Sequence, residues 1–418
     1  MECNCLFSRL PDELYLKIFR YLTHAEVCMC MQVCQKWNSL CNDDSLWREV
    51  NVGYGKVAGE NILPKLASKF PKIKGLVILS TELEARISRK NFTCGENEWR
   101  RFENLESITF ISCPGGLLDS IQGLLVSCPK LQSFKCECSR SFNQKHLLSL
   151  LQPSRSYVEL SIAHCAQIDD VTIYHALLNP NISCLRTLEI LNLDGVEFLS
   201  DIGIQGILEK CPVLRSLALD GEQLTDKTGH FIGNNYPRTL KNLSISFCDN
   251  LTDSTLSSLG KLKNLQSLYM KRGPLFTNDG FVSLFGQLSF DRESNKNPRG
   301  LLSLTLIECR GFLDSGLTKA AQSAPNLSHL DLSWCLNLTD KGLQAVALNC
   351  HTIQTLVLVG LKQPYCTDII GASMPRLRYL ELVQTDLVDD EELQLLKLKK
   401  PWLTILDYYG EEVMGLNH

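Results

Sequence analysis

Apolar residues recur in the pattern L-x-x-L-x-L along most of this chain, at intervals close to 26 residues. The clearest copies begin at Leu214, Leu327 and Leu377. The last apolar residue of each copy falls at 78, 110, 136, 162, 193, 219, 245, 270, 306, 332, 358, 382 and 408, and seven of the twelve intervals are 26 residues. A fixed period of this length predicts stacked units, each with a short strand that buries alternate residues.

The segment 325–350 shows what one unit contains after its strand. Thr339 is a good helix N-cap and Asp340 is favourable in the first turn, so a helix is expected to begin there. Leu343 and Val346 then give an inward stripe at helical spacing. Stacking of such units predicts an α/β fold in which parallel strands line a concave side and helices a convex side. This arrangement is the signature of leucine-rich repeats.

The repeat at 335–343 (CLNLTDKGL) resembles the cysteine-containing class of leucine-rich repeats. The resemblance implies a curved solenoid of about 12–13 units over 72–410, followed by a tail at 411–418. Two long intervals contain polar insertions, 86–101 and 289–300, which are expected to project as loops. Such loops are more often decoration than binding elements.

Residues 7–50 lie outside the repeat pattern and predict a separate all-helical module, with 51–71 as a linker or cap. Pro11 suits the first turn of a helix that carries Leu14, Ile18 and Leu22 on one face. The sequence Thr23-x-x-Glu26 is a capping box, so a second helix is expected to start at residue 23. That helix is expected to run through Val27, Cys30, Val33, Cys34 and Trp37.

About ten positions of this module match the F-box at that family's own spacing, and the chain therefore resembles F-box/leucine-rich-repeat proteins. The resemblance implies a non-catalytic substrate-recognition subunit of an SCF-type cullin–RING E3 ubiquitin ligase, whose repeats bind a protein destined for ubiquitination and proteasomal degradation. It also implies docking on the Skp adaptor through the matched residues, although sequence leaves open which of them face the adaptor and which face the module's own core. The matched residues are Leu10, Pro11, Leu14, Ile18, Leu22, Val33, Cys34, Trp37, Leu46 and Trp47.

Composition narrows this interpretation. The net charge of −4 argues against a nucleic-acid surface. The chain has no apolar run long enough for a membrane span, and its start lacks the pattern of a secretory signal. A cytoplasmic or nuclear location with reduced thiols is therefore expected, and many of the 19 cysteines recur at repeat-fixed, inward positions as small hydrophobes. His24 and the nearby cysteines lack a second cysteine pair, so we expect no metal site. The sequence contains no catalytic motif, so we expect no cofactor and no catalytic residue.

The outward positions of the last units are rich in apolar and aromatic residues, which predicts a substrate-binding strip. The alternative is that the tail covers this strip. A further alternative for the whole chain is an interaction scaffold or inhibitor that acts outside a ligase. The residues predicted to bind substrate are Tyr269, Lys271, Val357, Val359, Tyr379, Glu381, Val383, Ile405 and Tyr409.

Overall fold

The computed structural model describes residues 10–54, 62–80, 102–152, 155–178, 182–288, 300–362, 367–385 and 389–414. It divides into two compact units, one made of Met1–Gln167 with Asn181–Cys184 and the other of Ile168–Pro180 with Leu185–His418. The insertion expected at 86–101 and all but the last residue of 289–300 lie outside the described residues, as do residues 415–418 of the tail.

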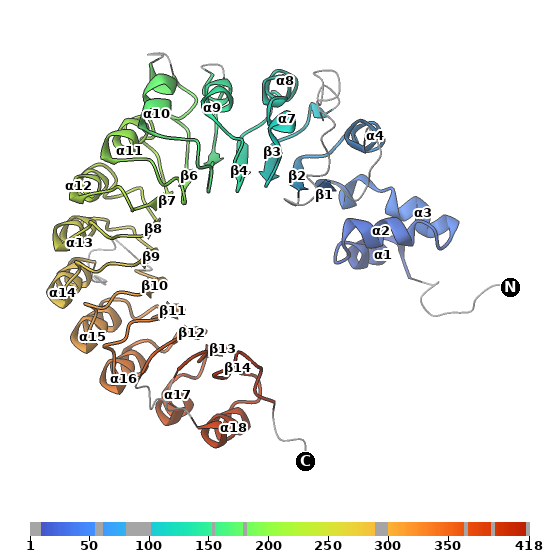
Figure 1. The fold of residues 1–418 in the computed structure, drawn as a ribbon. Helices are drawn as coiled ribbons and strands as arrows, with labels where there is room; N and C mark the ends of the chain where they lie inside the picture. The colour runs from blue at the N-terminus through green and yellow to red at the C-terminus, as the bar shows by residue number, and fades with distance from the viewer. Residues whose placement is uncertain are drawn as a thin grey trace. The chain divides into compact units, whose positions relative to one another are not determined.

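Unit 1 begins with short helices and continues as strands that alternate with helices (Figure 1). The strands β1 to β5 pair in parallel and in chain order. The elements are α1 (Asp12–Phe19), α2 (His24–Cys30), α3 (Gln35–Cys41), the 3-10 turn η2 (Asp44–Leu46), β1 (Glu49–Tyr54), α4 (Ile62–Lys69), β2 (Gly75–Ser80), β3 (Ser107–Ile111), α7 (Gly115–Leu118), α8 (Ile121–Ser127), β4 (Ser133–Glu137), α9 (Gln144–Leu150) and β5 (Glu159–Ser161).

Unit 2 repeats the alternation, with its strands along the inner side of an arc and its helices along the outer side (Figure 1). The elements are α10 (Asp170–Leu177), β6 (Ile190–Leu193), α11 (Asp201–Leu208), β7 (Ser216–Asp220), α12 (Asp226–Asn235), β8 (Asn242–Ser246), α13 (Asp253–Leu259), β9 (Ser267–Lys271), α14 (Asn278–Gln287), β10 (Ser303–Ile307), α15 (Asp314–Ser323), β11 (His329–Asp331), α16 (Asp340–Asn349), β12 (Thr355–Val357), α17 (Thr367–Ser373), β13 (Tyr379–Glu381), α18 (Asp390–Lys399) and β14 (Thr404–Leu406).

The predicted fold class, an open leucine-rich-repeat solenoid after a helical module, is confirmed. The ladder positions pair across neighbouring strands: Leu193 lies opposite Leu219, and Met270 opposite Leu306 despite the 36-residue step between them. These side chains are buried, as alternation in a strand requires. The structure also adds a strand that the repeat pattern did not reveal, because β1 pairs with β2 and buries Val50.

The repeat cysteines are buried, as predicted. Several donate a hydrogen bond to the preceding unit, as Cys335 Sγ does to the carbonyl of Leu306 at 3.2 Å. Burial raises the pKa of the Cys335 thiol to about 12. These cysteines thus fill the core and link a unit to the one before it.

The aspartate that opens each of several helices also joins that helix to the next unit. Asp226 begins α12, and its carboxylate accepts hydrogen bonds from the backbone N–H of Thr252 (2.9 Å), the hydroxyl of Thr252 (2.6 Å) and the hydroxyl of Thr255 (2.5 Å). The same contact recurs from Asp170 to Ser200, Asp201 to Thr225, Asp253 to Thr277 and Asp314 to Thr339. We call this series of inter-unit contacts the aspartate ladder.

The third helical residue of each next unit is matched to the aspartate ladder. It is either a threonine that donates to the carboxylate or a glycine that leaves room for it. A Cβ on Gly203 would lie 2.2 Å from Asp170 Oδ1, and one on Gly280 would lie 2.1 Å from Asp253 Oδ1. The recurrent D-x-G of the sequence therefore has a steric cause.

Candidate functional site

The amino-terminal module folds around two aromatic side chains of α1. Tyr15 and Phe19 are buried, and Trp37 of α3 packs edge-on against Phe19 with ring centroids 5.3 Å apart. Lys36 ties the start of α3 to the start of α1, because its Nζ lies 3.1 Å from Asp12 Oδ1 and also approaches the carbonyl of Leu10. The amino-terminal ends of α1 and α3 are thus neighbours on this module.

Several apolar residues predicted to dock on the adaptor are exposed on these helices. Leu14 and Ile18 share the outer face of α1, with 43% and 39% of their surface accessible. Pro11 is exposed at the start of α1, and Val33 and Cys34 are exposed just before α3. Apolar surface that a small folded module leaves exposed is typical of a protein interface.

Two exposed apolar residues on the same module escaped the sequence prediction. Tyr21 follows α1 and Met29 lies on α2, and both side chains are more than half exposed. The outward side of α2 could have been read from its helical periodicity once the bounds of the helix were known. Tyr21 and Met29 therefore add to the exposed apolar surface of the module.

The structure assigns Leu46 and Trp47 to packing, which corrects their predicted role as adaptor contacts. Both are buried. The Trp47 ring stacks on Phe70 with centroids 4.1 Å apart and an interplanar angle of 10°. Its indole N–H donates to the carbonyl of Cys41 at 2.7 Å. Trp47 therefore connects the helical module to the first repeat within unit 1. Three other residues predicted to contact the adaptor, Leu10, Leu22 and Trp37, are only partly exposed.

The second predicted helix is wrong in its extent. The capping box is confirmed, with the Thr23 N–H donating to Glu26 Oε2 at 2.7 Å and the Glu26 N–H donating to Thr23 Oγ1 at 3.3 Å. However, α2 ends at Cys30, and α3 starts only at Gln35 with Cys34 as its N-cap. The Cys34 Sγ accepts the N–H of Trp37 at 3.4 Å, a cap by a residue outside the usual capping types.

The second candidate surface is a row of partly exposed side chains in and just after the strands β9 to β13 of unit 2. These strands line the inner side of the arc (Figure 1). The structure places seven predicted substrate-binding residues there, all partly exposed: Tyr269, Lys271, Val357, Val359, Tyr379, Glu381 and Val383. The Tyr379 hydroxyl donates to Glu381 Oε2 at 2.8 Å. Burial is the main cause that raises the pKa of Tyr379 to about 12, and the neighbouring Glu381 carboxylate contributes to the same shift. These residues therefore form a partly exposed row across neighbouring strands and the turns that follow them.

The last unit corrects the predicted register by one residue. Leu380 of β13 pairs with Ile405 of β14, and Glu381 pairs with Leu406. Ile405 is 0% exposed, so it belongs to the core and cannot contact a substrate. Leu406 faces outward in its place, because a one-residue slip exchanges the two faces of a strand, and Tyr408 is exposed in the turn that follows. Tyr409 is exposed, but it lies in the turn after the strand.

The tail pairs with the edge of the last strand, and its described part does not follow the outward row. The N–H of Val413 donates to the carbonyl of Ile405 at 2.9 Å, and the N–H of Asp407 donates to the carbonyl of Glu411 at 3.0 Å. Leu406 and Glu412 form an antiparallel bridge. The tail therefore satisfies an edge that would otherwise expose unpaired backbone groups.

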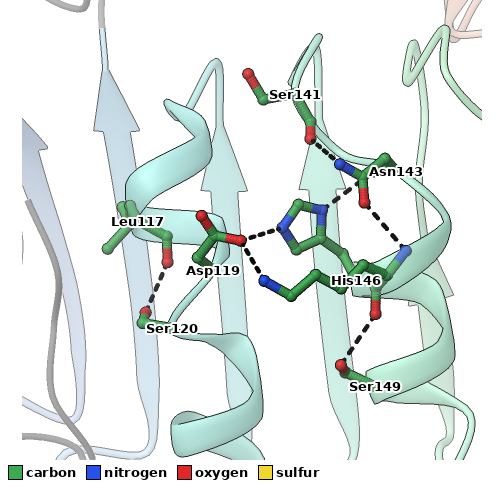
Figure 2. A network of polar contacts seen from close by, with 8 residues as sticks. Leu117, Asp119, Ser120, Ser141, Asn143, His146 and Ser149 are labelled. Atoms are coloured by element: carbon green, nitrogen blue, oxygen red, sulfur yellow. Dashed lines mark hydrogen bonds and ion pairs between the residues drawn. The ribbon is translucent and has the colours of Figure 1, made fainter. Parts of the chain in front are cut away.

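In unit 1 the buried His146 lies beside the exposed Asp119, a pairing that has two of the elements of a catalytic dyad (Figure 2). His146 Nε2 lies 3.4 Å from Asp119 Oδ1, and Nδ1 accepts the N–H of Asn143 at 3.1 Å. The nearby Ser149 hydroxyl donates to the carbonyl of Lys145, so it is not activated by the histidine. The arrangement caps α9 and joins it to the preceding unit, which is a structural role.

The described residues contain neither a metal-binding cluster nor a helix that could span a membrane. No group of three or more His, Cys, Asp or Glu side chains there is placed to hold a metal ion. None of the helices in the described ranges has the length and apolar character needed to cross a membrane. The candidate sites of the described chain are therefore its two exposed surfaces.

Comparison with known proteins agrees with the helical module and with the repeats. Residues 7–52 match the F-box-like domain family, so the amino-terminal module is an F-box-like domain. The chain is 24% identical over 264 residues to lysine-specific demethylase 2A of Xenopus tropicalis, and 22% identical over 283 residues to lysine-specific demethylase 2B of Mus musculus. These matches cover 62% and 66% of this chain but only 20% and 19% of the relatives.

The fold is also that of a solved repeat protein. Rad7, from the crystal structure of the Rad7 and Elc1 complex in yeast, superposes with a TM-score of 0.61 at 17% identity. The match covers 96% of this chain and 93% of the other. At this identity the likeness establishes the fold alone.

Proposed function

We propose that this chain is the substrate-recognition subunit of an SCF-type cullin–RING ubiquitin ligase. The F-box-like domain would dock on the Skp adaptor, and the repeats would hold a protein for ubiquitination and proteasomal degradation. The observation that carries the proposal is an F-box-like domain with exposed Leu14, Ile18 and Val33, placed ahead of a repeat solenoid. Catalysis of ubiquitin transfer would belong to other subunits.

Physical reasoning supports docking through α1 and the start of α3. A helical module of about 40 residues cannot bury all of its apolar side chains by itself. Trp47 and Leu46 are satisfied within unit 1, whereas Leu14 and Ile18 are not. Burial of these two side chains against a partner would stabilise the complex by roughly 2 kcal/mol or more, which is the range of an interface hot spot.

The relatives suggest an enzyme reading, which we do not adopt. The two demethylases extend far beyond the stretch that this chain matches, and that stretch is about a fifth of their length. The Rad7 structure, which was solved as a complex with Elc1, supports the general idea that a solenoid of this fold assembles with a protein partner. The proposal therefore assigns binding and presentation to the chain, and chemistry to its partners.

The test is direct binding of the purified full chain to a purified Skp adaptor by isothermal titration calorimetry. We expect Leu14→Asp with Ile18→Asp to weaken binding at least 30-fold, because both charges would enter an apolar interface. The matched control is Leu348→Asp with Leu395→Asp, which alters two exposed leucines on α16 and α18.

The control should bind as the wild type does. If the wild-type chain does not bind the adaptor, or if the two double variants bind equally well, the ligase assignment is wrong. A scaffold or inhibitor acting outside a ligase then becomes the better description.

A further inference from the structure

Partly or fully exposed apolar side chains in the strands β12 and β14, and in the turns that directly follow β11 to β14, form an apolar strip with carboxylates set into it. The strip is defined as Trp334, Val357, Val359, Val383, Leu406 and Tyr408. Strand register makes these residues neighbours: Val357, Glu381 and Leu406 are adjacent across β12, β13 and β14. Neighbouring strands lie about 4.8 Å apart, so the strip is continuous.

Trp334 closes one end of this strip. It follows β11 in the left-handed conformation, with φ of +60°, and its N–H donates to the carbonyl of Val359 at 2.8 Å. Its ring lies over Gly360, where an added Cβ would come within 2.5 Å of the indole. Trp334 is still 39% exposed. The indole is thus fixed in place with one surface open to a ligand.

Two carboxylates lie within the strip without a cation. Glu381 sits between Val357 and Leu406, and Asp331 is the neighbour of Val357 on β11. Among the described residues neither carboxylate forms an ion pair, and each receives its hydrogen bonds from an uncharged donor, the Tyr379 hydroxyl or the Ser333 N–H and hydroxyl. None of the outward positions of β10 to β14 is Lys or Arg. His329 is at an outward position of β11, and Lys271 on β9 lies over the Phe247 ring.

These charges distinguish three classes of partner. A purely apolar segment would bury both carboxylates without a counter-ion, which is costly. A phosphorylated or acidic segment would bring like charge against them. A segment that carries Lys or Arg beside apolar side chains would cover the strip and also pair the carboxylates.

We propose that the strip and its two carboxylates bind a protein segment in which lysine or arginine alternates with aliphatic or aromatic residues, without phosphorylation. This deepens the proposed function, since it gives the substrate its recognition chemistry. It rests on charge complementarity with Asp331 and Glu381 and on the apolar surface around them. The capped tail supports it as well, because the described tail residues pair with the strand edge and not with the strip.

The test uses a phage-displayed library of random 12-residue peptides selected on the immobilised full chain. Sequencing of the selected pool should show the ratio of Lys and Arg to Asp and Glu at least threefold above the input library, with apolar residues adjacent to the basic ones. The enriched peptide is then synthesised and its affinity measured by fluorescence anisotropy. Its affinity should weaken at least tenfold for Asp331→Asn with Glu381→Gln.

The matched control removes the same charge from the helix side. Glu209→Gln with Asp279→Asn changes two exposed carboxylates, at the C-cap of α11 and in the first turn of α14, and it should leave peptide affinity within twofold of wild type. A pool without basic enrichment, an acidic pool, no selectable binders, or equal weakening by both double variants would each overturn the proposal. Adaptor binding is measured on the same preparations, so loss of the peptide site is distinguishable from failure of the ligase assignment.

Discussion

Replacing Asp226 by alanine should destabilise unit 2 by about 3 kcal/mol. The carboxylate joins α12 to α13 through three hydrogen bonds of 2.5–2.9 Å from Thr252 and Thr255. A hydrogen bond to a charged group contributes roughly 1.5–3 kcal/mol. The site is only partly buried, so water can replace some of this, and about 1 kcal/mol per bond is the appropriate scale.

The control for this substitution is Asp279→Ala, which removes an exposed carboxylate from the first turn of α14. It should cost less than about 1 kcal/mol, the usual size of a helix-dipole contribution. Repeat arrays need not unfold in one step, so native-state hydrogen exchange of peptides from α12 and α13 should accompany urea unfolding. If Asp226→Ala matches the Asp279→Ala control within about 0.5 kcal/mol, the aspartate ladder is not a source of stability.

A double-mutant cycle isolates the contact itself. Thr255→Val should cost roughly 1 kcal/mol in the wild type and close to nothing in the Asp226→Ala background. The pKa of Asp226 supports the same contact: burial acts to raise it, but the hydrogen bonds from Thr252 and Thr255 outweigh burial and leave it lowered. A lowered folded pKa stabilises the fold above about pH 4 and loses that contribution as pH falls through the folded value, so the deficit of Asp226→Ala should shrink in acid.

Three further predictions test the remaining packing and register. Burial lowers the pKa of His146, so the folded state resists its protonation; stability should be full above about pH 6.5 and fall below it, and the melting temperature of His146→Gln should depend less steeply on pH between 7 and 5. Trp47→Ala should cost about 3–5 kcal/mol in urea unfolding through loss of its stack on Phe70, whereas Trp47→Phe should cost much less. Ile405→Asp should destabilise the chain by more than about 3 kcal/mol but Leu406→Asp by less than about 1, and the reverse order in thermal unfolding would show that the register of the last strand is wrong.

Local signals predicted the elements that depend on nearby residues. The pair Thr23 and Glu26 specifies the start of α2, because both halves of a capping box lie within one turn. The break between α2 and α3 was not predicted, because its cap is Cys34, a residue type that is not a usual N-cap. The strand β1 was not predicted either. Val50 and Val52 are only two alternating apolar positions, which are too few to separate a first strand from the end of the helical module.

Contacts between units could be predicted only in part. A polar residue followed by aspartate, as in Ser200-Asp201 and Thr225-Asp226, predicted several helix starts. The partner of each such aspartate lies some 24–30 residues further along, in the next coil. The insertion after α14 shows how packing overrides spacing. Asn278 stands in the place of the aspartate and accepts the N–H of Gly316 at 3.0 Å, so the contact spans the insertion and β9 still pairs with β10 in register.

In the last unit, the exposure of Leu406 and Tyr408 and the capping of the strand edge both follow from the phase of β14. The sequence from Leu403 to Tyr408 allows two phases, since apolar residues occupy both sets of alternate positions. In the observed phase Asp407 lies on the inward side, and its Oδ1 accepts the N–H groups of Tyr409 and Glu411, both at 2.9 Å. That turn, which includes Gly410 at φ +81°, returns the chain so that Val413 pairs with Ile405.

In the opposite phase the Asp407 carboxylate would point to the exposed face of the strand. The N–H groups of Tyr409 and Glu411 would then lose their acceptor. The end of a solenoid needs such a cap, since its last strand has no further unit to pair with. Capping therefore selects the phase in which Leu406 points outward and Tyr408 is exposed. The last unit thus gains two partly or fully exposed apolar side chains as a consequence of how the array ends.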